Sequence, residues 1–274
     1  MELSLNAQRF SGSDYVTLYD RYRPSPPSDL LQQAIRYTRN EQDVRVVDLG
    51  CGTGISTLAW SGLAEDITGV EPSEAMLDFA RRKLSAQPGK VSFLQAYADH
   101  LPFSDQSIDI VSCSQSFHWM EPVSTLKEAN RVLRPGGVFV IYDCGWPPSC
   151  DWQAEQAYRR LFQGVSLLSE QLEGPKAVFF AKDQHLQNIT DSGYFSFIKV
   201  AQYHQVQDGG PERLIGLARS QGGLEALFKK GYSEEETGWV DFVKSIGLQK
   251  KSFDRMTFHY SVIYAVKTPG EQQE

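Results

Sequence analysis

Apolar runs alternate with amphipathic segments through the first half of the chain. Five runs are apolar enough to form strands buried on both faces: "VRVVDL", "DITGVE", "VSFLQA", "IDIVSCS" and "GGVFVIYD", from residue 44 to about 143. Helical segments separate them, beginning near Ile55 and including "SEAMLDFARRKL" and "STLKEANRVL". This alternation predicts an α/β fold with a doubly wound, mostly parallel sheet and helices on both faces.

The segments on either side of this core are less regular. The stretch "SGSDYVTLYDRYRPSPPSDLLQQAIRY" predicts a short helix stopped by Pro24, Pro26 and Pro27, then a second helix capped by Ser28. Beyond residue 145, "AEQAYRRLFQGV" and the range 211–247 have helical patterns, "KDQHLQNITDSGYFSFIKVAQY" predicts a helix and a strand, and "MTFHYSVIYAV" alternates like a closing strand.

One domain over residues 1–274 accounts for these segments. We expect N-terminal lid helices over 1–43, a ligand-binding core over 44–145, and insertions over 146–181 and 211–247. Insertions at the carboxyl ends of parallel strands lie beside the ligand crevice, so both are predicted to form substrate lids.

Composition and charge exclude several classes of protein. Hydrophobic residues make up 41% of the chain and charged residues 22%, as in a globular cytoplasmic protein, and no apolar run approaches the ~20 residues of a membrane helix. The net charge of −7, without a basic cluster, disfavours nucleic acid. Cys51, Cys113, Cys144 and Cys150 fit no zinc spacing and are expected to be reduced, with a Cys144–Cys150 disulfide as the lesser alternative; no metal is predicted.

The stretch "VVDLGCGTGIST", residues 46–57, carries the first chemical signal. Gly50, Gly52 and Gly54 follow an apolar strand and precede a helix, so ligand atoms can approach bare backbone and the unpaired N–H groups of a helix N-terminus. A dinucleotide fingerprint requires a further glycine at the position of Ile55, so the pattern differs from that of dehydrogenases.

Two carboxylates narrow the ligand. Glu71 ends the next strand in "GVEPSEAML", where a carboxylate can accept hydrogen bonds from both ribose hydroxyls. Asp48 lies just before the glycine loop and could hold an ammonium group. A molecule that carries both a ribose and an ammonium group is S-adenosylmethionine.

Four motifs in order carry a resemblance to a known family. "VVDLGCGTGIST", "GVEPSEAML", "ADHLPFSDQSIDIVSCSQSFHW" and "EANRVLRPGGVFVI" resemble the class I S-adenosylmethionine-dependent methyltransferases. "RYRPSPPSDL" and "FHW" make the chain similar to the small-molecule branch (methyltransferase type 11), which includes trans-aconitate methyltransferase. The resemblance implies a Rossmann-like seven-stranded sheet with an antiparallel last strand, S-adenosyl-L-methionine as cofactor and S-adenosyl-L-homocysteine as product.

The resemblance also implies a set of cofactor-binding residues: Tyr22, Asp48, Gly50, Cys51, Gly52, Gly54, Glu71, Pro72, Met76, Ala98, Asp99 and Ser114. Ala98 and Asp99 fall where the family contacts the adenine edge. Many relatives have an acidic residue or serine two places before Asp99, where this chain has Tyr97, so the bond to the adenine amino group could come from Asp99 or from backbone.

The acceptor pocket is predicted beside "SQSFHW". His118 could take a proton from an attacking hydroxyl, or it could only shape the pocket, because transfer to a carboxylate needs no base. Phe117, Trp119, Trp146 and Tyr15 are the expected wall residues. Arg23, Arg159, Arg160, Arg213 and Arg219 could hold a carboxylate, or be solvated surface residues.

Together these observations predict methyl transfer to a small organic acceptor, at a carboxylate or hydroxyl oxygen, by a monomer or homodimer without nucleic-acid or membrane partners. "SQSFHW" stands where amino-methylating DNA enzymes carry Asn or Asp followed by two prolines, and this difference argues against a nucleic-acid substrate. The alternatives are a catalytically silent regulatory protein that binds S-adenosylmethionine and, disfavoured by the loop, a nicotinamide dehydrogenase.

Overall fold

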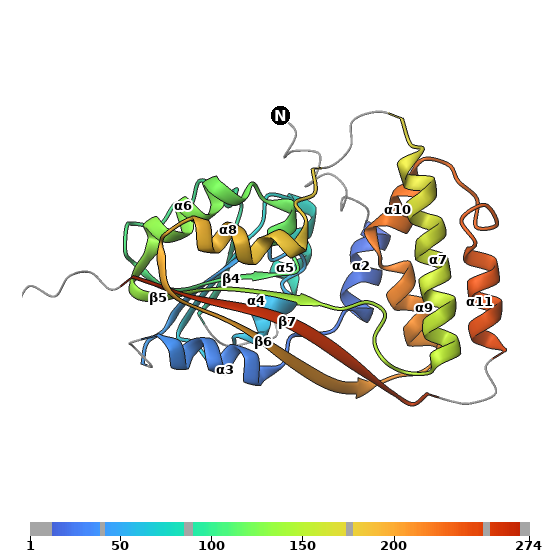
Figure 1. The fold of residues 1–274 in the computed structure, drawn as a ribbon, viewed down its shortest axis with the longest axis horizontal. Coiled ribbons are helices and arrows are strands. Elements are labelled where there is room, and N and C mark those ends of the chain that lie inside the picture. Colours follow the sequence, from blue (N-terminus) through green and yellow to red (C-terminus); the bar gives the residue numbers. More distant parts are fainter. Residues whose placement is uncertain (1–12, 39–41, 85–89, 174–177, 249–252, 269–274) are drawn as a thin grey trace, which may run out of the picture.

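A seven-stranded sheet forms the centre of the protein (Figure 1). The computed structural model describes residues 13–38, 42–84, 90–173, 178–248 and 253–268. In the order β3-β2-β1-β4-β5-β7-β6, the strands are β1 (Arg45–Leu49), β2 (Asp66–Val70), β3 (Val91–Leu94), β4 (Ile108–Ser114), β5 (Leu133–Cys144), β6 (Phe195–Asp208) and β7 (Arg255–Lys267). The first five strands pair in parallel, and β7 runs antiparallel to both neighbours. The predicted fold, including its antiparallel last strand, is confirmed.

Helices cover both faces of this sheet. The longer ones near it are α3 (Ser28–Tyr37), α5 (Glu74–Leu84) and α6 (Pro122–Val132); α4 (Ile55–Ala59), α8 (His185–Asp191) and the short 3₁₀ turns η1 (Phe117–Trp119) and η2 (Lys182–Gln184) complete the set. In Figure 1, α6 and α8 lie on one face and α3 on the other. Side chains that alternate along β1 explain the two layers, because Val46 packs in the cluster that contains α3 and Val47 in the cluster that contains α6.

The strands do not all have two buried faces. β1, β4 and β5 at the centre of the sheet are almost entirely buried, as expected, but β3 at one edge is largely half-exposed. β6 at the other edge is mostly exposed or half-exposed over its 14 residues. The prediction of two buried faces is therefore wrong for β3, because an edge strand has a neighbour on one side only.

Five helices form a separate layer beyond one end of the sheet (Figure 1). They are α2 (Ser13–Tyr22), α7 (Trp152–Glu170), α9 (Pro211–Arg219), α10 (Gly222–Lys229) and α11 (Trp239–Gly247). Leu161, Leu217, Leu224 and Phe242 bury the facing sides of four of them in the same apolar cluster as α3. The predicted lid insertions thus pack with the N-terminal helix; residues 1–12, 39–41 and 174–177 of those predicted segments lie outside the described residues.

The start of α3 differs from the prediction. Pro27, with extended φ and ψ of −60° and 135°, is the N-cap, and Ser28 is already helical. No side-chain cap forms, and the Ser28 hydroxyl accepts a hydrogen bond from Gln32 instead. The proline stop does occur, since α2 ends at Tyr22.

All four cysteines are free thiols, and the alternative disulfide between Cys144 and Cys150 does not form. Within the described ranges, no helix has the length and apolar character to span a bilayer.

Candidate active site

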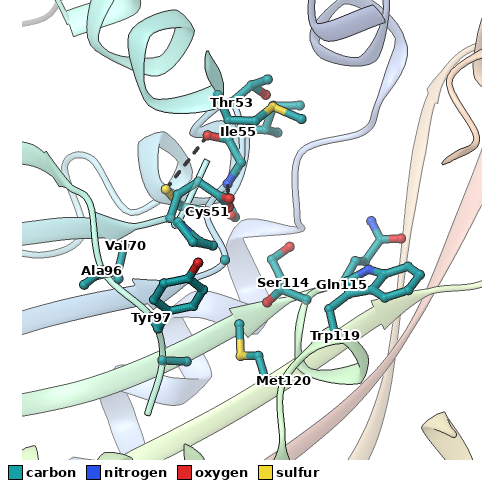
Figure 2. A pocket seen from close by; sticks show the side chains of 18 of the residues that line it. Cys51, Thr53, Ile55, Val70, Ala96, Tyr97, Ser114, Gln115, Trp119 and Met120 are labelled. Atoms are coloured by element: carbon teal, nitrogen blue, oxygen red, sulfur yellow. Dashed lines mark hydrogen bonds between the residues drawn. The ribbon is translucent and has the colours of Figure 1, made fainter. Parts of the chain in front are cut away.

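A cleft lies at the carboxyl ends of β1, β2 and β4, beside the end of α2. It encloses about 1200 Å³ of space, the open solvent at its mouth included. Figure 2 shows Cys51 and Thr53 on the loop side, with Gln115 and Trp119 at the other end. The lining residues are Tyr19, Arg23, Pro24, Gly50, Cys51, Gly52, Thr53, Ile55, Ser56, Val70, Glu71, Pro72, Met76, Ala96, Tyr97, Ala98, Asp99, Ser114, Gln115, Ser116, Trp119, Met120, Glu121 and Thr125.

The glycine loop presents bare backbone to this cleft. Gly50 and Gly52 have φ of 65° and 54°, and a Cβ atom on Gly50 would lie 2.6 Å from Ser116 Cβ. Gly54, predicted to bind the cofactor, does not line the cleft: it is the left-handed N-cap of α4, where a Cβ atom would lie 2.7 Å from the Phe93 ring. Gly54 therefore permits the close packing of α4 on β3.

Asp48 does not face the cleft, contrary to the prediction that it holds an ammonium group. Its side chain is fully buried. Oδ2 accepts hydrogen bonds from the Ser56 and Thr57 hydroxyls at 2.6 and 2.7 Å, and Oδ1 accepts one from Ser112 at 2.7 Å. Burial raises the pKa of Asp48, although these three hydroxyls oppose the shift. Asp48 joins β1, β4 and α4 and so fixes the loop from behind.

Glu71 lines the cleft in a position to accept further hydrogen bonds. Oε2 accepts a bond from the Gly52 N–H at 3.1 Å, and Oε1 accepts one from the Ser73 N–H at 3.0 Å. Each carboxylate oxygen retains acceptor capacity for a hydroxyl. Burial raises the pKa of Glu71, with smaller opposing contributions from the two N–H groups.

Most of the other predicted cofactor residues border the same cleft. Pro72, Met76, Ala98, Asp99 and Ser114 line it, as does Cys51. Burial first, and then the charge of Glu71, raise the pKa of the Cys51 thiol well above its ordinary value. Cys51 therefore stays protonated and is not a nucleophile.

On α2, the structure selects a different tyrosine from the predicted one. Tyr22 lies on the side of α9: its ring packs over Gly216 and its hydroxyl donates to Glu212 at 3.2 Å. Tyr15 is buried and donates to the Ser220 carbonyl at 2.8 Å, so it joins two helices rather than binding substrate. Tyr19, one turn before Arg23, lines the cleft instead.

Arg23 brings a positive charge to the cleft. Nε donates to the Ser220 hydroxyl at 3.0 Å, and Nη2 donates to the Ser220 carbonyl and Gln221 Oε1 at 2.9 and 3.0 Å. The guanidinium lies 4.7 and 4.8 Å from the ring centroids of Tyr19 and Trp146. These partners fix the group but leave its charge uncompensated by a carboxylate among the described residues.

The other four candidate arginines lie outside the cleft in the described structure. Arg159 and Arg160 lie on a shallow outer groove of α7. Arg213 donates to Gln207 and to the Asp208 carbonyl, and Arg219 pairs with Glu225 at 2.8 Å. Of the five arginines predicted to hold a carboxylate, Arg23 alone lines the cleft in the described structure.

The predicted acceptor wall is only partly present. Trp119 lines the cleft, but Phe117 is fully buried under it, in edge contact with Phe139 and His185. Trp146 lies one layer back, where its indole N–H donates to Gln115 at 3.3 Å. Gln115 lines the cleft but was not predicted from the sequence. Its signal is structural: a φ of 51° is unusual for a non-glycine residue, and such strain is frequent at functional sites.

His118 faces away from the cleft, which contradicts its predicted roles as base and substrate contact. Its ring lies among Trp119, Phe179 and Asp143, and it is 6% exposed. Burial, then the neighbouring Lys182 and His185, lower the pKa of His118 to about 2. No histidine lines the described cleft. Glu121 does line it: burial raises the pKa of its carboxyl, but the hydrogen bonds from Ser124 and Val123 outweigh burial, so the pKa is lowered.

A mostly parallel sheet with an antiparallel last strand, a glycine loop after β1 and a carboxylate after β2 form the fold and loop of the class I S-adenosylmethionine-dependent methyltransferases. The methyltransferase domain family matches residues 47–141, and this segment belongs to that family. The match spans β1 to β5 and so leaves out α2 and the helical layer.

Known proteins resemble the chain over different extents. An uncharacterised methyltransferase of Mycobacterium tuberculosis is 36% identical over 137 residues, which cover 50% of this chain and 53% of that protein. A ubiquinone/menaquinone biosynthesis C-methyltransferase of Campylobacter jejuni is 33% identical over 111 residues, 38% of this chain and 46% of that protein. The chain thus spans about half the length of these relatives. The structure of a putative type II methyltransferase from Anaeromyxobacter dehalogenans shares the fold, with a TM-score of 0.69 at 19% identity over 90% of this chain and 99% of that one.

Proposed function

We propose that the protein transfers the methyl group of S-adenosylmethionine to a small organic acceptor. The observation that carries this proposal is the meeting of Gly50, Gly52 and the Glu71 carboxylate along one cleft at the carboxyl ends of parallel strands. Glu71 would accept the ribose hydroxyls, Met76, Ala98 and Asp99 would border the adenine, and the loop backbone would face the methionine part.

We propose a carboxylate oxygen as the acceptor atom in preference to a hydroxyl. A carboxylate attacks the sulfonium methyl without losing a proton: a C–O bond forms, the C–S bond breaks, and its electron pair leaves on S-adenosylhomocysteine. The uncompensated charge of Arg23 at the described cleft supports this choice, because a guanidinium binds a carboxylate and a carboxylate acceptor needs no base. Alignment in line with the methyl group and exclusion of water then dominate catalysis.

Arg23 would hold a carboxylate in this reaction. It is the one arginine among the described residues that lines the cleft, and Ser220, Gln221, Tyr19 and Trp146 already fix its guanidinium. A fixed guanidinium binds a carboxylate with little further loss of side-chain entropy. The methionine carboxylate and the acceptor carboxylate are the two anions it could serve.

A second candidate is transfer to carbon, which the similarity to the C. jejuni C-methyltransferase supports. Carbon acceptors require an electron-rich ring rather than a carboxylate. The two candidates therefore differ in the acceptor's chemistry and share the cofactor site.

The test combines binding with transfer. Calorimetric titration with S-adenosylmethionine, S-adenosylhomocysteine and NAD should show binding of the two adenosyl compounds alone. Incubation with methyl-tritiated S-adenosylmethionine and a panel of carboxylic acids, phenols and quinols should then yield a base-labile methyl ester. A base-stable product from a phenol or quinol would rule out the carboxylate in favour of a hydroxyl or carbon acceptor. Binding without transfer to any acceptor would favour the regulatory alternative. Binding of NAD alone would overturn the proposal.

A further inference from the structure

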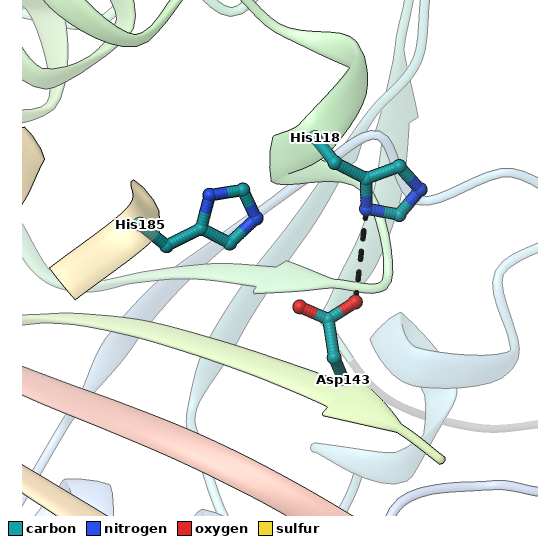
Figure 3. Close-up of side chains that lie close together, drawn as sticks. All are labelled: His118, Asp143 and His185. Atoms are coloured by element: carbon teal, nitrogen blue, oxygen red, sulfur yellow. Dashed lines mark ion pairs between the residues drawn. The ribbon is translucent and has the colours of Figure 1, made fainter. Parts of the chain in front are cut away.

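Two histidines and a carboxylate meet outside the cleft, from three separate elements (Figure 3). His118 comes from η1 after β4, Asp143 from the end of β5, and His185 from the first turn of α8. One ligand atom from each lies within 4.8 Å of those of the other two. His118 Nδ1 is 3.7 Å from Asp143 Oδ1, beyond hydrogen-bonding distance.

The imidazole nitrogens in this cluster lack the partners that buried polar atoms normally have. His185 is 2% exposed, and neither of its ring nitrogens forms a hydrogen bond. His118 Nδ1 is likewise buried without a partner. Buried polar atoms in native proteins are nearly always satisfied, so a group of three unsatisfied nitrogens around one carboxylate indicates a missing ligand.

We propose that His118, Asp143 and His185 bind a divalent first-row transition metal ion, of which Zn²⁺ is the probe. Two imidazoles and one carboxylate form a donor set typical of such ions. Three atoms 4.8 Å apart are each about 2.8 Å from the point at their centre. Side-chain rotations that move each atom by under about 1 Å toward this point reach the 2.0–2.2 Å of Zn–N and Zn–O bonds.

The carboxylate of the cluster is paired with a cation that a metal ion can displace. Among the described residues, the ammonium of Lys182 lies 2.6 Å from Asp143 Oδ1. The Lys182 side chain is 37% exposed and can swing into solvent, so a metal ion can replace it on the carboxylate. His185 packs against Phe117 and His118 against Phe179, so both rings lie near the position that metal binding requires.

The position of the cluster suggests what the ion does. The Phe180 N–H donates to the His118 carbonyl at 2.9 Å, so the segment leading into η2 already lies along η1. A metal ion would join α8 and this segment to the ends of β4 and β5, directly behind Trp119 of the cleft. It would act as a structural ion that fixes one wall of the active site.

The experiment measures Zn²⁺ per chain by equilibrium dialysis and elemental analysis of the metal-stripped full chain, with the visible spectrum of a Co²⁺ form as second readout. We expect one Zn²⁺ per chain, Co²⁺ bands of a site with nitrogen and oxygen ligands, and a higher melting temperature with metal. His185→Ala and Asp143→Asn should each weaken binding at least about a hundredfold. Lys182→Gln should bind Zn²⁺ more tightly than the parent chain, because it removes the competing ammonium.

The matched control is the double variant His204→Ala, His259→Ala. These two exposed histidines pair across β6 and β7, where their imidazoles offer a place for adventitious surface binding. The control should keep one Zn²⁺ per chain. Less than stoichiometric binding by the parent chain, or equal affinity in the parent and His185→Ala, would overturn the proposal; circular dichroism of each variant separates lost binding from lost folding.

Discussion

The two ends of the cleft are built in different ways. At the loop end, Gly50, Gly52 and Glu71 come from one short stretch of chain, and the fully buried carboxylate of Asp48 fixes the loop from behind. At the other end, Arg23 is held by Ser220, which is 197 residues away in sequence. The loop end is thus part of the sheet's own core, whereas the opposite end depends on how α2 docks on the helical layer.

This difference explains why the family match stops where it does. Residues 47–141 contain the loop end entire, and the helical layer falls outside them. Chains that share the cofactor half can therefore differ in the helices that close the other end, and with them in acceptor.

The largest expected effect is on the core beneath the loop. Asp48→Ala leaves three buried hydroxyls without their acceptor and should lower the free energy of unfolding by about 3 kcal/mol or more. Asp48→Asn keeps an acceptor oxygen and should stay within about 1 kcal/mol of the parent. Urea denaturation measures both, with Asp78→Ala, at an exposed position of α5, as control. Equal loss in Ala and Asn variants would show that charge, rather than hydrogen bonding, holds the loop.

Protonation of Glu71 should control cofactor affinity. Only the ionised carboxylate accepts both ribose hydroxyls, and burial raises its pKa above the ordinary glutamate value. Affinity for S-adenosylhomocysteine should therefore be constant well above that pKa and fall about tenfold per pH unit below it. Calorimetry across pH measures this fall. Glu71→Gln should bind about tenfold more weakly at neutral pH and lose the pH dependence; a parallel fall in the variant would assign the titration to another group.

A side chain at Gly50 should block the loop end. The Cβ atom of Gly50→Ala meets Ser116 and Met120, so S-adenosylhomocysteine should bind at least about tenfold more weakly, or 1.4 kcal/mol. Gly62→Ala is the matched control, since Gly62 has a similar φ of 78° but open space around its Cβ position. If both variants bind equally well, close approach of the ligand to Gly50 is wrong.

Arg23 tests the opposite end. Arg23→Gln should weaken S-adenosylhomocysteine about tenfold if the guanidinium holds the methionine carboxylate, and should leave methylthioadenosine, which lacks the amino-acid part, unchanged. Equal affinity of the variant for S-adenosylhomocysteine, with a raised KM for the acceptor, would assign Arg23 to the acceptor instead.

The smallest effect is expected at Tyr22. Tyr22→Phe removes a hydrogen bond to the exposed Glu212 and should change the free energy of unfolding by no more than about 0.5 kcal/mol, with no change in cofactor affinity. Tyr19→Phe is the comparison within the cleft. Weaker cofactor binding by Tyr22→Phe would restore this residue to the site.

The fold, the position of the glycine loop and the carboxylate after the second strand could be predicted from the sequence. These follow from local signals: alternating apolar and amphipathic segments, glycines between a strand and a helix, and spacing along one βαβ unit. Parallel strands then bring their carboxyl ends to one edge, and Pro72, Met76 and Asp99, which the resemblance to methyltransferases implied, line the cleft there.

The direction in which individual side chains point depends on tertiary packing and could not be predicted. Asp48, Phe117 and His118 are close in sequence to residues that line the cleft, yet their buried side chains point away from it. On α2, Tyr19 rather than Tyr22 lines the cleft, because the docking of α2 on α9 fixes the rotation of α2 about its axis. The pairing of Arg23 with Ser220 and the meeting of His118, Asp143 and His185 join elements far apart in the chain. No periodicity or spacing encodes such contacts, since they depend on the packing of whole layers.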